Sequence, residues 1–404
     1  MMKNKVSYIG LGYIGLPTAV LTAKSGFETF GYDIDKDKIF QISKGDISIN
    51  EPFLKEELNK VLELGYLNVS TSLIESETYV VVVPTPLVKN NKPDISIVKS
   101  SIANIIPILK EGDLIIIEST CPVLTTEKML KYIYQERPEL ESLIYMAYCP
   151  ERVLPGNILY ELVNNDRIVG GINEKSSDMA KLFYSNFVEG QIHITDSKTA
   201  EMCKLTENSA RDTQIAFANE LSIICDEADI NVWELIELAN KHPRVNILSP
   251  GIGVGGHCIA VDPWFLVADY PDNAKLIKHV RETNTYKTSW CLEKIFKARN
   301  EFIAKENRDP TIACMGLAYK PDVDDLRESP AVKIVRSLVS SDCKILISEP
   351  NIQYHKEFKL VSIEDALTNA DIIVWLVGHN QYLNKTSNEY KIQFDFCGLK
   401  KYKI

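Results

Sequence analysis

Short apolar runs alternate with helix-like patterns along the first ~190 residues of the chain. One of these runs, VVVV at 80–83, contains no polar position, as is typical of central strands that are covered on both faces. Runs bounded by turn residues predict strands at residues 6–9, 27–32, 79–83, 114–117, 143–147 and 167–169. Strands that alternate with helices in this way are typical of a parallel sheet.

The pattern changes between residues 197 and 228, where no glycine or proline occurs and apolar residues recur at helical spacing. A long helix is therefore expected there, and a second helix is expected soon after it, over residues 232–239. Ser329 and Pro330 suit the N-cap and the first position of a later helix. Around that helix the strand pattern returns, with strands expected at 311–315, 344–347 and 371–377.

These patterns predict an α/β protein with two Rossmann-like βαβ domains, joined by a central helical segment that contains a long helix. The expected domains are residues 1–195, 196–305 and 306–404. At about 150 residues per domain, a chain of 404 residues agrees with two or three domains.

Composition narrows the possible partners. The chain has 45 Lys and Arg against 55 Asp and Glu, a net charge of -10, which argues against binding to nucleic acid or to an anionic membrane. It lacks an apolar run of the ~20 residues that a membrane helix needs. Its nine cysteines form no C-x-x-C pair, so neither a disulfide framework nor a metal site is expected, and a reducing cytoplasm fits best.

A glycine-rich turn follows the first predicted strand. The sequence GLGYIG places Gly10, Gly12 and Gly15 between that strand and a helix, and Asp33 comes at the end of the next strand. Glycines let the backbone approach a pyrophosphate, the helix N-terminus attracts its charge, and the carboxylate accepts ribose hydroxyls. This combination predicts a dinucleotide site, and Asp33 would repel a ribose 2′-phosphate, so NAD is favoured over NADP.

Two threonines lie just after predicted strands, where ligands bind in open α/β sheets. Thr85 follows the strand at 79–83, and Thr120 follows the strand at 114–117. Ordinary loop chemistry would also explain either threonine.

A second glycine-rich segment, GVGGHCIAVDP at 253–263, surrounds one cysteine. A helix that began near His257 would lower the pKa of the Cys258 thiol and favour the nucleophilic thiolate. Asp262 lies one turn further on and could reach the same site. An inert core cysteine is the alternative, and it is our interpretation of the other eight cysteines. We interpret His257 as a packing or hydrogen-bonding residue, since no set of metal ligands accompanies it.

The long predicted helix carries Glu201, Lys204, Asn208 and Arg211 at spacings that place them on one face. A solvated polar stripe would explain them, but Asn208 is a poor helix former with no stabilising reason to be there. Lys204 and Asn208, one turn apart, could jointly hold an oxyanion.

Two loops contain groups suited to acid–base chemistry and anion binding. The CPERVLPG loop offers Glu151 as a general base and Arg152 as a phosphate or carboxylate clamp, although an exposed ion pair would explain both. The segment 316–329 carries Lys320 and Arg327, which suit an anionic ligand such as a nucleotide diphosphate.

Taken together, these segments resemble the NAD-dependent nucleotide-sugar 6-dehydrogenases, the UDP-glucose/GDP-mannose dehydrogenase family, over essentially the whole chain. UDP-glucose dehydrogenases typically carry Lys-Asp after the cysteine and a second acid four positions after the loop glutamate. Here Val261 stands in place of the lysine and Pro155 in place of the acid, so UDP-glucose is the less expected substrate. Three segments resemble the branch of the family that oxidises UDP-N-acetyl-D-mannosamine. They are CPERVLPG at 149–156, TAEMCKLTENSARD at 199–212 and HPRVNILSPGIGVGGHCIAVDPWF at 242–265.

The resemblance implies a four-electron oxidation of a sugar CH2OH group to a carboxylate, with two NAD in succession, for a cell-surface polysaccharide. Cys258 would form a thiohemiacetal with the aldehyde and then a thioester that water hydrolyses. Lys204 would be the acid/base or oxyanion partner, and Asn208 would bind the same oxygen. Asp262 would orient the lysine or the water, and Glu151 would assist hydrolysis.

The family pattern also assigns binding residues. For NAD these are the three glycines of the first turn and Tyr13, Ile14, Asp33, Thr85, Thr120 and Arg327, with Thr120 also placed at the catalytic site. For the UDP-sugar they are Arg152, Val153, Lys204, Asn208, Arg211, His242, Arg244, Gly255, Tyr319 and Lys320. In the family, residues around Arg244 reach the neighbouring subunit's site, which implies a homodimer bridged by the long helix.

One departure from the family and two alternative functions stay open. Relatives often have a basic residue in a D-x-[RK]-G segment that touches the ligand, where this chain has Cys397. The same chemistry on UDP-glucose, UDP-N-acetylglucosamine or UDP-N-acetylgalactosamine is the first alternative. A non-catalytic sensor of NAD or of a nucleotide sugar is the second.

Overall fold

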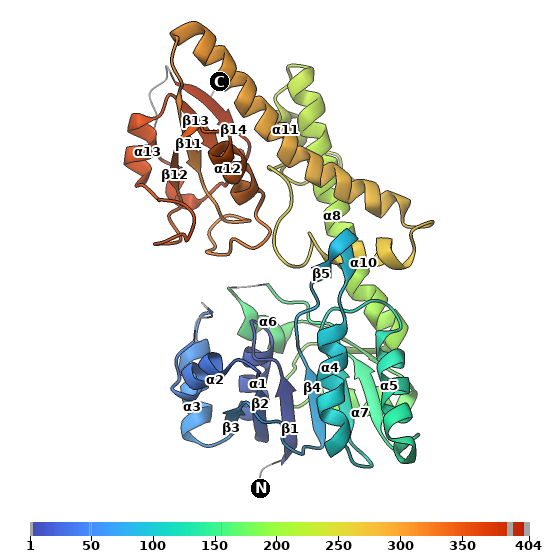
Figure 1. Cartoon of the computed structure of the whole chain (residues 1–404). Coiled ribbons are helices and arrows are strands. Elements are labelled where there is room, and N and C mark those ends of the chain that lie inside the picture. Colours follow the sequence, from blue (N-terminus) through green and yellow to red (C-terminus); the bar gives the residue numbers. More distant parts are fainter. Residues whose placement is uncertain (1–2, 48, 50, 155, 386–390, 400–404) are drawn as a thin grey trace. The chain divides into compact units, whose positions relative to one another are not determined.

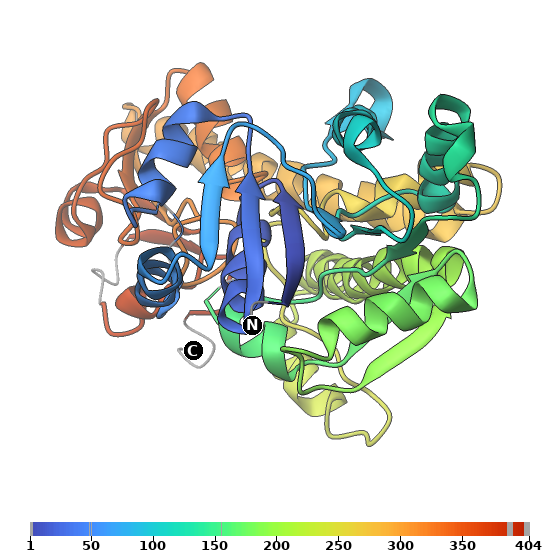
Figure 2. The same cartoon turned by 90° about the horizontal axis from the view of Figure 1, so that it is seen from below.

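The computed structural model describes residues 3–47, 49, 51–154, 156–385 and 391–399. Two compact units divide the chain, Met1–Thr206 and Glu207–Ile404. Figures 1 and 2 show their elements from two directions.

The N-terminal unit is built around an eight-stranded sheet with the strand order β10-β9-β8-β7-β4-β1-β2-β3. Its strands are β1 (Lys3–Ile9), β2 (Phe27–Tyr32), β3 (Leu67–Ser70), β4 (Thr78–Val81), β7 (Leu114–Ile117), β8 (Tyr145–Tyr148), β9 (Arg167–Gly171) and β10 (Ile192–Asp196). Its helices are α1 (Gly15–Lys24), α2 (Lys36–Ser43), α3 (Leu54–Glu63), α4 (Ser96–Ile105), α5 (Thr125–Glu136), α6 (Ile158–Asn164) and α7 (Glu174–Tyr184). A small hairpin, β5 (Leu87–Val88) and β6 (Lys92–Pro93), follows β4.

Both faces of this sheet are buried, which explains its apolar strands. In β7, Leu114 and Ile116 pack with residues of α1, α3 and α7, whereas Ile115 and Ile117 pack with residues of α4 and α5. Successive side chains of a strand point to opposite faces, so a strand covered on both sides is apolar at every position. The helices on the two faces can be followed in Figures 1 and 2.

One edge of this sheet departs from the parallel arrangement that the sequence predicts. All neighbouring strands of the sheet are parallel except β8 and β9, which pair antiparallel through Ala147 and Tyr148. The chain leaves β8 through the loop at 149–156 and the short helix α6, and β9 then runs in the opposite direction.

The predicted long helix is α8 (Ser197–Glu227), a helix of 31 residues. It begins in the N-terminal unit and continues into the C-terminal unit. The C-terminal unit then contains α9 (Val232–Ala239), α10 (Asp262–Asp269) and a second long helix, α11 (Lys275–Glu306).

A four-stranded parallel sheet forms the core of the rest of the C-terminal unit, in the order β12-β11-β13-β14. Residues of α11 and α12 (Pro330–Ser340) pack on one face, and residues of α13 (Ile363–Asn369) pack on the other. The predicted cap of α12 is confirmed, since the Ser329 side chain accepts a hydrogen bond from the amide of Val332 and Pro330 occupies the first turn. The strands are β11 (Thr311–Met315), β12 (Lys344–Ser348), β13 (Ile372–Trp375) and β14 (Ile392–Asp395).

Candidate active site

The three glycines of the first turn do different physical work. A Cβ on Gly10, whose φ is +98°, would lie 2.3 Å from the carbonyl oxygen of Val82, and a Cβ on Gly15 would lie 2.0 Å from the carbonyl oxygen of Gly10. These two glycines are required because the chain packs against itself. A Cβ on Gly12 would have no atom within 4 Å, so this glycine leaves the backbone open to a ligand.

The helix that follows the turn has an N-terminus suited to an anion. No side chain caps the N-terminus of α1, and its first turn holds no acidic residue. The positive end of the helix dipole is therefore not compensated by a side-chain cap or an acid of this turn. Tyr13 and Ile14, which the resemblance to the family assigns to the cofactor, are half-buried in this turn.

Asp33 lies at the end of β2, beside the same turn. Its carboxylate accepts hydrogen bonds from the Leu11 amide (3.0 Å), the Asp35 amide (3.1 Å) and the Lys38 ammonium (2.8 Å). Burial raises the pKa of Asp33, but these hydrogen bonds outweigh it and hold the pKa below its ordinary value. About one tenth of the side chain (9%) stays exposed, so an ionised carboxylate borders the open backbone at Gly12. The turn therefore fits a dinucleotide with free ribose hydroxyls.

Two loops that carry predicted site residues are tied together beside this turn. The Val83 amide, two residues before Thr85, donates a hydrogen bond of 2.8 Å to the Ser119 hydroxyl, and Thr120 is the next residue. The strands that precede them, β4 and β7, are neighbours in the sheet. Thr85 and Thr120 are both half-buried.

A buried ionic cluster supports these loops, and sequence reasoning missed it. Glu118 accepts a hydrogen bond of 2.6 Å from the Tyr184 hydroxyl and lies 3.5 Å from the guanidinium of Arg167. Arg167 also contacts the Cys149 sulfur at 3.5 Å, so it joins the starts of the loops after β7 and β8. Burial raises the pKa of Glu118. No motif marks Arg167, because it is 49 residues from its partner Glu118.

The loop after β8 is joined to the long helix. The Lys204 ammonium donates a hydrogen bond of 2.5 Å to the backbone oxygen of Glu151, which brings these two predicted catalytic residues together. Arg152 is exposed and donates to the backbone oxygen of Asp166 at 3.1 Å, while Val153 is half-buried. Pro155 lies outside the described residues.

Glu201 lies on the predicted helix α8 but is buried, so the alternative of a solvated polar stripe is wrong at this position. The Glu201 side chain is buried and accepts hydrogen bonds from the Leu124 amide (2.6 Å) and from the amide and hydroxyl of Thr126 (2.8 and 2.6 Å). These groups begin α5, so Glu201 binds the N-terminus of that helix. Burial raises the pKa of Glu201.

Cys258 is exposed and lies in a loop, not in a helix. The expectation of a helix that begins near His257 is wrong, because α10 begins at Asp262. Pro263 suits the first turn of a helix, which places the start there. The amide of Asp262 donates a hydrogen bond of 2.8 Å to the Cys258 carbonyl, so the cysteine stands one turn before the helix.

Two predicted catalytic residues of the C-terminal unit meet in this region. The Asn208 side-chain amide donates a hydrogen bond of 2.5 Å to the carboxylate of Asp262, which is 3% exposed. Asp262 comes four positions after Cys258, and Asn208 comes one helical turn after Lys204.

The long helices hold the cysteine loop on both sides of Cys258. Before it, the Gly251 amide donates to the Asn219 side chain (2.8 Å), and the Thr288 hydroxyl donates to the Ile252 carbonyl (2.7 Å). After it, Arg281 donates to the Ile259 carbonyl at 3.3 Å.

Buried polar contacts between α8 and α11 fix the side chains that hold the cysteine loop. Arg281 pairs with Asp212 at 2.6 Å, and Asn284 donates to the same carboxylate at 2.7 Å and accepts from Asn219 at 2.8 Å. Sequence reasoning missed these contacts, because the partners are 65 to 72 residues apart and no local motif joins them.

The cysteine loop also packs directly on the loop after β11. A Cβ on Gly255 would lie 2.8 Å from the Tyr319 Cβ, and the Gly256 amide donates a hydrogen bond of 2.9 Å to the Arg327 carbonyl. Lys320 is half-buried beside Tyr319, and the exposed Arg327 pairs with Asp325 at 2.6 Å. The structure therefore brings together Gly255 and Tyr319, which the resemblance to the family assigns to the substrate. Gly255 is three residues before Cys258.

Three other predicted substrate residues are not gathered at this contact. Arg211 is exposed and donates to the Gln214 side chain at 3.3 Å. His242 and Arg244 are exposed after α9, where the Arg244 amide donates to the His242 ring at 3.3 Å.

Cys397 is not a cationic contact. The Asp395 carboxylate accepts hydrogen bonds from the amides of Cys397 (3.1 Å), Gly398 (2.8 Å) and Leu399 (3.1 Å) and so closes the turn. The Cys397 sulfur would lie 3.7 Å from a Cβ on Gly378, and burial raises the pKa of the thiol.

No helix in the described part of the chain is long and apolar enough to span a membrane, and no group of three metal-ligating side chains occurs there.

Comparison with known proteins adds to this geometry. Models of the UDP-glucose/GDP-mannose dehydrogenase family match the NAD binding domain at residues 4–188, the central domain at 198–286 and the UDP binding domain at 313–399.

Individual relatives match over nearly the whole chain. The UDP-N-acetyl-D-mannosamine dehydrogenase of Campylobacter jejuni is 48% identical, over 96% of this chain and 98% of that protein. The NDP-N-acetyl-D-galactosaminuronic acid dehydrogenase of Ralstonia nicotianae is 47% identical, over 93% of this chain and 91% of that protein. The solved structure of the UDP-D-ManNAc dehydrogenase of Pyrococcus horikoshii is 38% identical with a TM-score of 0.90, over 98% of this chain and 96% of that one.

Proposed function

The chain belongs to the UDP-glucose/GDP-mannose dehydrogenase family, and from that premise we propose that it oxidises UDP-N-acetyl-D-mannosamine at C6 to UDP-N-acetyl-D-mannosaminuronate. The observation that carries the proposal is the direct packing of the Cys258 loop on Tyr319, inside the unit that contains the UDP binding domain. The 48% identity to the Campylobacter enzyme supports this sugar. We place the product in cell-surface polysaccharide synthesis. The cytoplasm is the proposed location, because the nine cysteines are all free thiols.

The work is divided among three domains in this proposal. Residues 1–195 bind NAD, residues 196–305 carry the long helices, most of the catalytic groups and the dimer contact, and residues 306–404 bind the UDP-sugar. NAD, when bound, supplies the hydride acceptor for each of two oxidations. Gly10, Gly12, Tyr13, Ile14 and Gly15 would line its pyrophosphate, and Asp33 would accept the adenosine ribose hydroxyls. Thr85, Thr120 and Arg327 would complete its site.

The chemistry at C6 needs a nucleophile. An aldehyde has no hydride to give until a nucleophile adds to its carbon, and the Cys258 thiolate would add there to form a thiohemiacetal. Loss of the remaining C6 hydride gives a thioester, and attack by water gives the carboxylate and returns the thiol. Overall, one CH2OH group, two NAD and one water yield one carboxylate, two NADH and three protons.

The other groups assigned to catalysis have separate tasks in this scheme. Lys204 would exchange the proton of the C6 oxygen and stabilise its negative charge, and Asn208 would donate a hydrogen bond to the same oxygen. The contact between Asn208 and Asp262 supports a role for Asp262 in orienting these groups or the water. The contact between Lys204 and the Glu151 backbone supports a place for Glu151 near the thioester, where it would assist hydrolysis.

The remaining predicted contacts bind the UDP-sugar. Gly255, Tyr319 and Lys320 would hold it from the cysteine loop and the loop after β11. The other residues assigned to it are Arg152, Val153, Lys204, Asn208, Arg211, His242 and Arg244.

A homodimer is part of the proposal. The long helix α8 exposes Phe217 and Ile224 by 57% and 55%, and α9 exposes Leu238 by 64%. Apolar side chains of this size are suited to a protein interface. Arg244 would reach the site of the second subunit, as the resemblance to the family implies.

The second candidate is the same oxidation of UDP-N-acetylgalactosamine. The relative from Ralstonia favours it, since it is almost as similar to this chain as the Campylobacter enzyme. The two sugars are distinguished by measuring kcat/KM for NADH formation with purified UDP-N-acetylmannosamine, UDP-N-acetylgalactosamine, UDP-N-acetylglucosamine and UDP-glucose. The first proposal requires the highest value with UDP-N-acetylmannosamine. A higher value with any other sugar refutes it, and binding of UDP-sugars without NADH formation would identify a non-catalytic sensor.

A further inference from the structure

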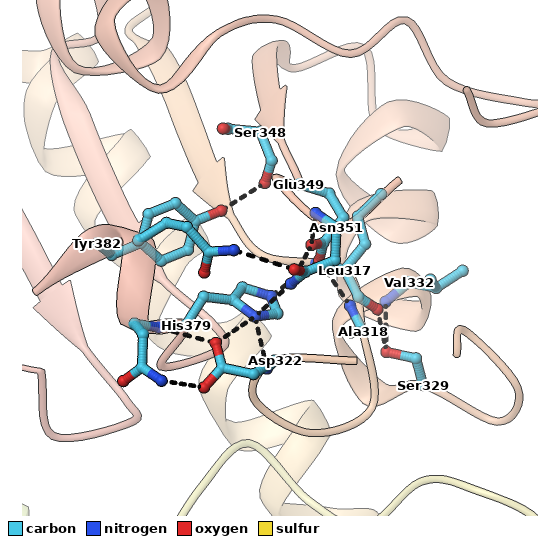
Figure 3. Close-up of polar contacts among 12 residues, drawn as sticks. Leu317, Ala318, Asp322, Ser329, Val332, Ser348, Glu349, Asn351, His379 and Tyr382 are labelled. Atoms are coloured by element: carbon cyan, nitrogen blue, oxygen red, sulfur yellow. Dashed lines mark hydrogen bonds and ion pairs between the residues drawn. The ribbon is translucent and has the colours of Figure 1, made fainter. Parts of the chain in front are cut away.

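A buried histidine and a buried glutamate meet at the carboxyl end of the C-terminal sheet (Figure 3). Glu349 directly follows β12, and His379 lies four residues after the end of β13. Neither side chain has any exposed area, and His379 Nε2 lies 3.0 Å from Glu349 Oε2. No motif in the sequence marks either residue, and neither belongs to the chemistry described above.

Glu349 gathers donors from three segments. The amides of Leu317 (2.7 Å) and Ala318 (3.0 Å) donate to one carboxylate oxygen, and the Asn351 amide and side chain (3.0 and 3.2 Å) donate to the other. His379 provides the fifth contact. A buried carboxylate with this many donors is stable as the anion, and it fixes the backbone at the start of the loop after β11.

The contacts of His379 determine which ring nitrogen carries the hydrogen. Its Nδ1 lies 2.9 Å from the backbone amide of Asp322 and 2.9 Å from the side-chain amide of Asn351, and both of these groups are donors. Asn351 is held in this orientation because its own oxygen accepts from Gln381 at 3.0 Å. Nδ1 is therefore the acceptor, and the hydrogen on Nε2 is donated to Glu349.

The contacts of His379 therefore hold the loop after β11 at two points, residues 317–318 and residue 322. Through Glu349 it holds Leu317 and Ala318, and through Nδ1 it holds Asp322. Tyr319 and Lys320 lie between these anchored points. Asp322 is further fixed from the segment that follows the histidine, since the backbone and side-chain amides of Asn380 donate to its carboxylate at 2.9 and 2.6 Å.

We propose that His379 is a positioning residue, which acts through Glu349 and Asp322 to set the loop that presents Tyr319 and Lys320 to the UDP-sugar. This inference rests on the proposed function for its ligand. The effect extends to the nucleophile, because Gly255 and Gly256 pack on Tyr319 and Cys258 is two residues after Gly256. A displaced Tyr319 would leave that segment without its support.

Three substitutions separate the two hydrogen bonds of the ring. His379→Ala removes both, His379→Asn keeps an acceptor near the position of Nδ1, and His379→Gln keeps a donor near the position of Nε2. Glu349 retains four other donors when Nε2 is lost, whereas the Asp322 amide has Nδ1 as its acceptor. His379→Asn should therefore preserve more UDP affinity than His379→Gln.

The matched control is His355→Ala. His355 is also a buried histidine of the C-terminal unit, 8% exposed, and its Nδ1 accepts from the amides of Glu357 (3.1 Å) and Phe358 (3.2 Å). Its substitution removes an imidazole of the same size without touching the loop at 317–322. Circular dichroism melting identifies variants that remain folded at the assay temperature.

The experiment measures the affinity of the full-length chain for UDP by titration calorimetry, with hydrogen exchange of the amides at 317, 318 and 322. We expect the dissociation constant for UDP to rise about tenfold in His379→Ala, about threefold in His379→Asn and by less than twofold in His355→Ala. The KM for the UDP-sugar should rise with it, while kcat falls less. A change in His379→Ala no larger than that in the control, or no rescue by His379→Asn over His379→Gln, overturns the proposal.

Failure of the proposed dehydrogenase function can be distinguished from failure of the proposed role of His379. If the wild-type chain binds UDP but oxidises no UDP-sugar, that function is wrong, and the role of His379 is still judged from UDP affinity. If the wild-type chain does not bind UDP, both ideas fail as stated. Exchange at 317, 318 and 322 that is equal in His379→Ala and His355→Ala overturns the positioning role in every case.

Discussion

The first turns of the eight-stranded and the four-stranded sheet have the same backbone arrangement. After β1, the amide of Gly10, at φ +98°, donates to the Tyr32 carbonyl at 2.8 Å, and the next amide, of Leu11, donates to Asp33. After β11, the amide of Gly316, at φ +100°, donates to the Ser348 carbonyl at 2.8 Å, and the next amide, of Leu317, donates to Glu349. In both sheets a glycine in the left-handed region lets the chain turn toward an acid at the end of the adjacent strand.

The two turns then diverge at the helix. In the N-terminal unit α1 begins at Gly15, and no side chain caps it. In the C-terminal unit α12 begins only at Pro330. The Ser329 hydroxyl accepts a hydrogen bond from the Val332 amide and also donates to the Leu317 carbonyl at 2.6 Å. The first helix has no side-chain cap at its N-terminus, where we propose that NAD binds, whereas the second is capped by its own serine.

The two acids, Asp33 and Glu349, also differ in how far their side chains are exposed. Asp33 keeps 9% of its side chain exposed beside an open glycine, whereas Glu349 has none and is enclosed by His379 and Asn351. The same glycine turn and acid therefore occur in two forms. The acid is partly exposed in the N-terminal sheet, where we propose that it binds a ribose, and it is fully buried in the C-terminal sheet, where it holds a longer loop.

The largest effect is expected at the proposed nucleophile, Cys258, which lies in a loop outside both sheets. Cys258→Ser should lower turnover by about a thousandfold or more, because the serine hydroxyl ionises less readily and an ester is cleaved less readily than a thioester. The affinity for UDP should change by less than about threefold, since the C-terminal sheet and its loop are unaltered. NADH formation and calorimetry measure the two quantities, with Cys343→Ser, at a half-buried cysteine of the same unit, as the control. Turnover within tenfold of wild type would remove the covalent scheme.

Paired substitutions in the first turn test whether its glycines differ as the geometry says. Gly15→Ala would place a Cβ 2.0 Å from the Gly10 carbonyl, so we expect a loss of about 1–3 kcal/mol in the free energy of unfolding. Gly12→Ala meets no atom within 4 Å and should leave that free energy unchanged while NAD affinity falls about tenfold. Denaturant unfolding and NAD titration measure the pair. Equal stability of both variants would contradict this account of the turn.

The smallest effect concerns acid stability in the C-terminal unit. Burial raises the pKa of Glu349, but the hydrogen bonds from His379 and from the amides of Leu317 and Asn351 outweigh it, so the pKa lies below its ordinary value. A carboxylate with a depressed pKa contributes stability above its unfolded pKa, and that contribution is lost as the pH falls through the folded value. Glu349→Gln has no such contribution, so its difference from wild type in unfolding free energy should shrink by about 1 kcal/mol or more as the pH falls below about 5.

Urea unfolding of both proteins at several pH values checks this expectation. His355→Ala serves as the comparison for acid sensitivity that does not come from Glu349. A difference between wild type and Glu349→Gln that stays constant with pH would show that Glu349 does not titrate as an isolated depressed carboxylate.

The parts of the site that could be predicted from sequence are those whose residues lie close together along the chain. GLGYIG and Asp33 lie within one strand–helix–strand unit, so their spacing predicts their contact. The helix at 197–227 follows from a stretch without glycine or proline, and the cap at Ser329 follows from the preferences of helix starts. Pro263 is the sequence signal that could have located the start of α10, whereas the sequence analysis considered a start near His257.

The parts that could not be predicted join distant segments. Glu118 and Arg167 are 49 residues apart, Asp212 and Arg281 are 69 apart, and no single motif contains both members of either pair. The likeness between the two sheets is hidden for a similar reason, because the loop before α12 separates the glycine from the helix and breaks the familiar spacing. Glu201 shows a further limit. Helical spacing gives the face on which it lies, but not that α5 supplies donors there.

The central claim is that this chain carries a sugar alcohol through both oxidations on one thiol, and the number of NADH formed per uronate tests it most directly. Wild-type protein is incubated with UDP-N-acetylmannosamine and excess NAD, NADH is followed by absorbance, and the uronate is quantified by mass spectrometry. The account predicts two NADH per uronate and no free aldehyde. One NADH per molecule of released aldehyde, or no NADH at all, would contradict it.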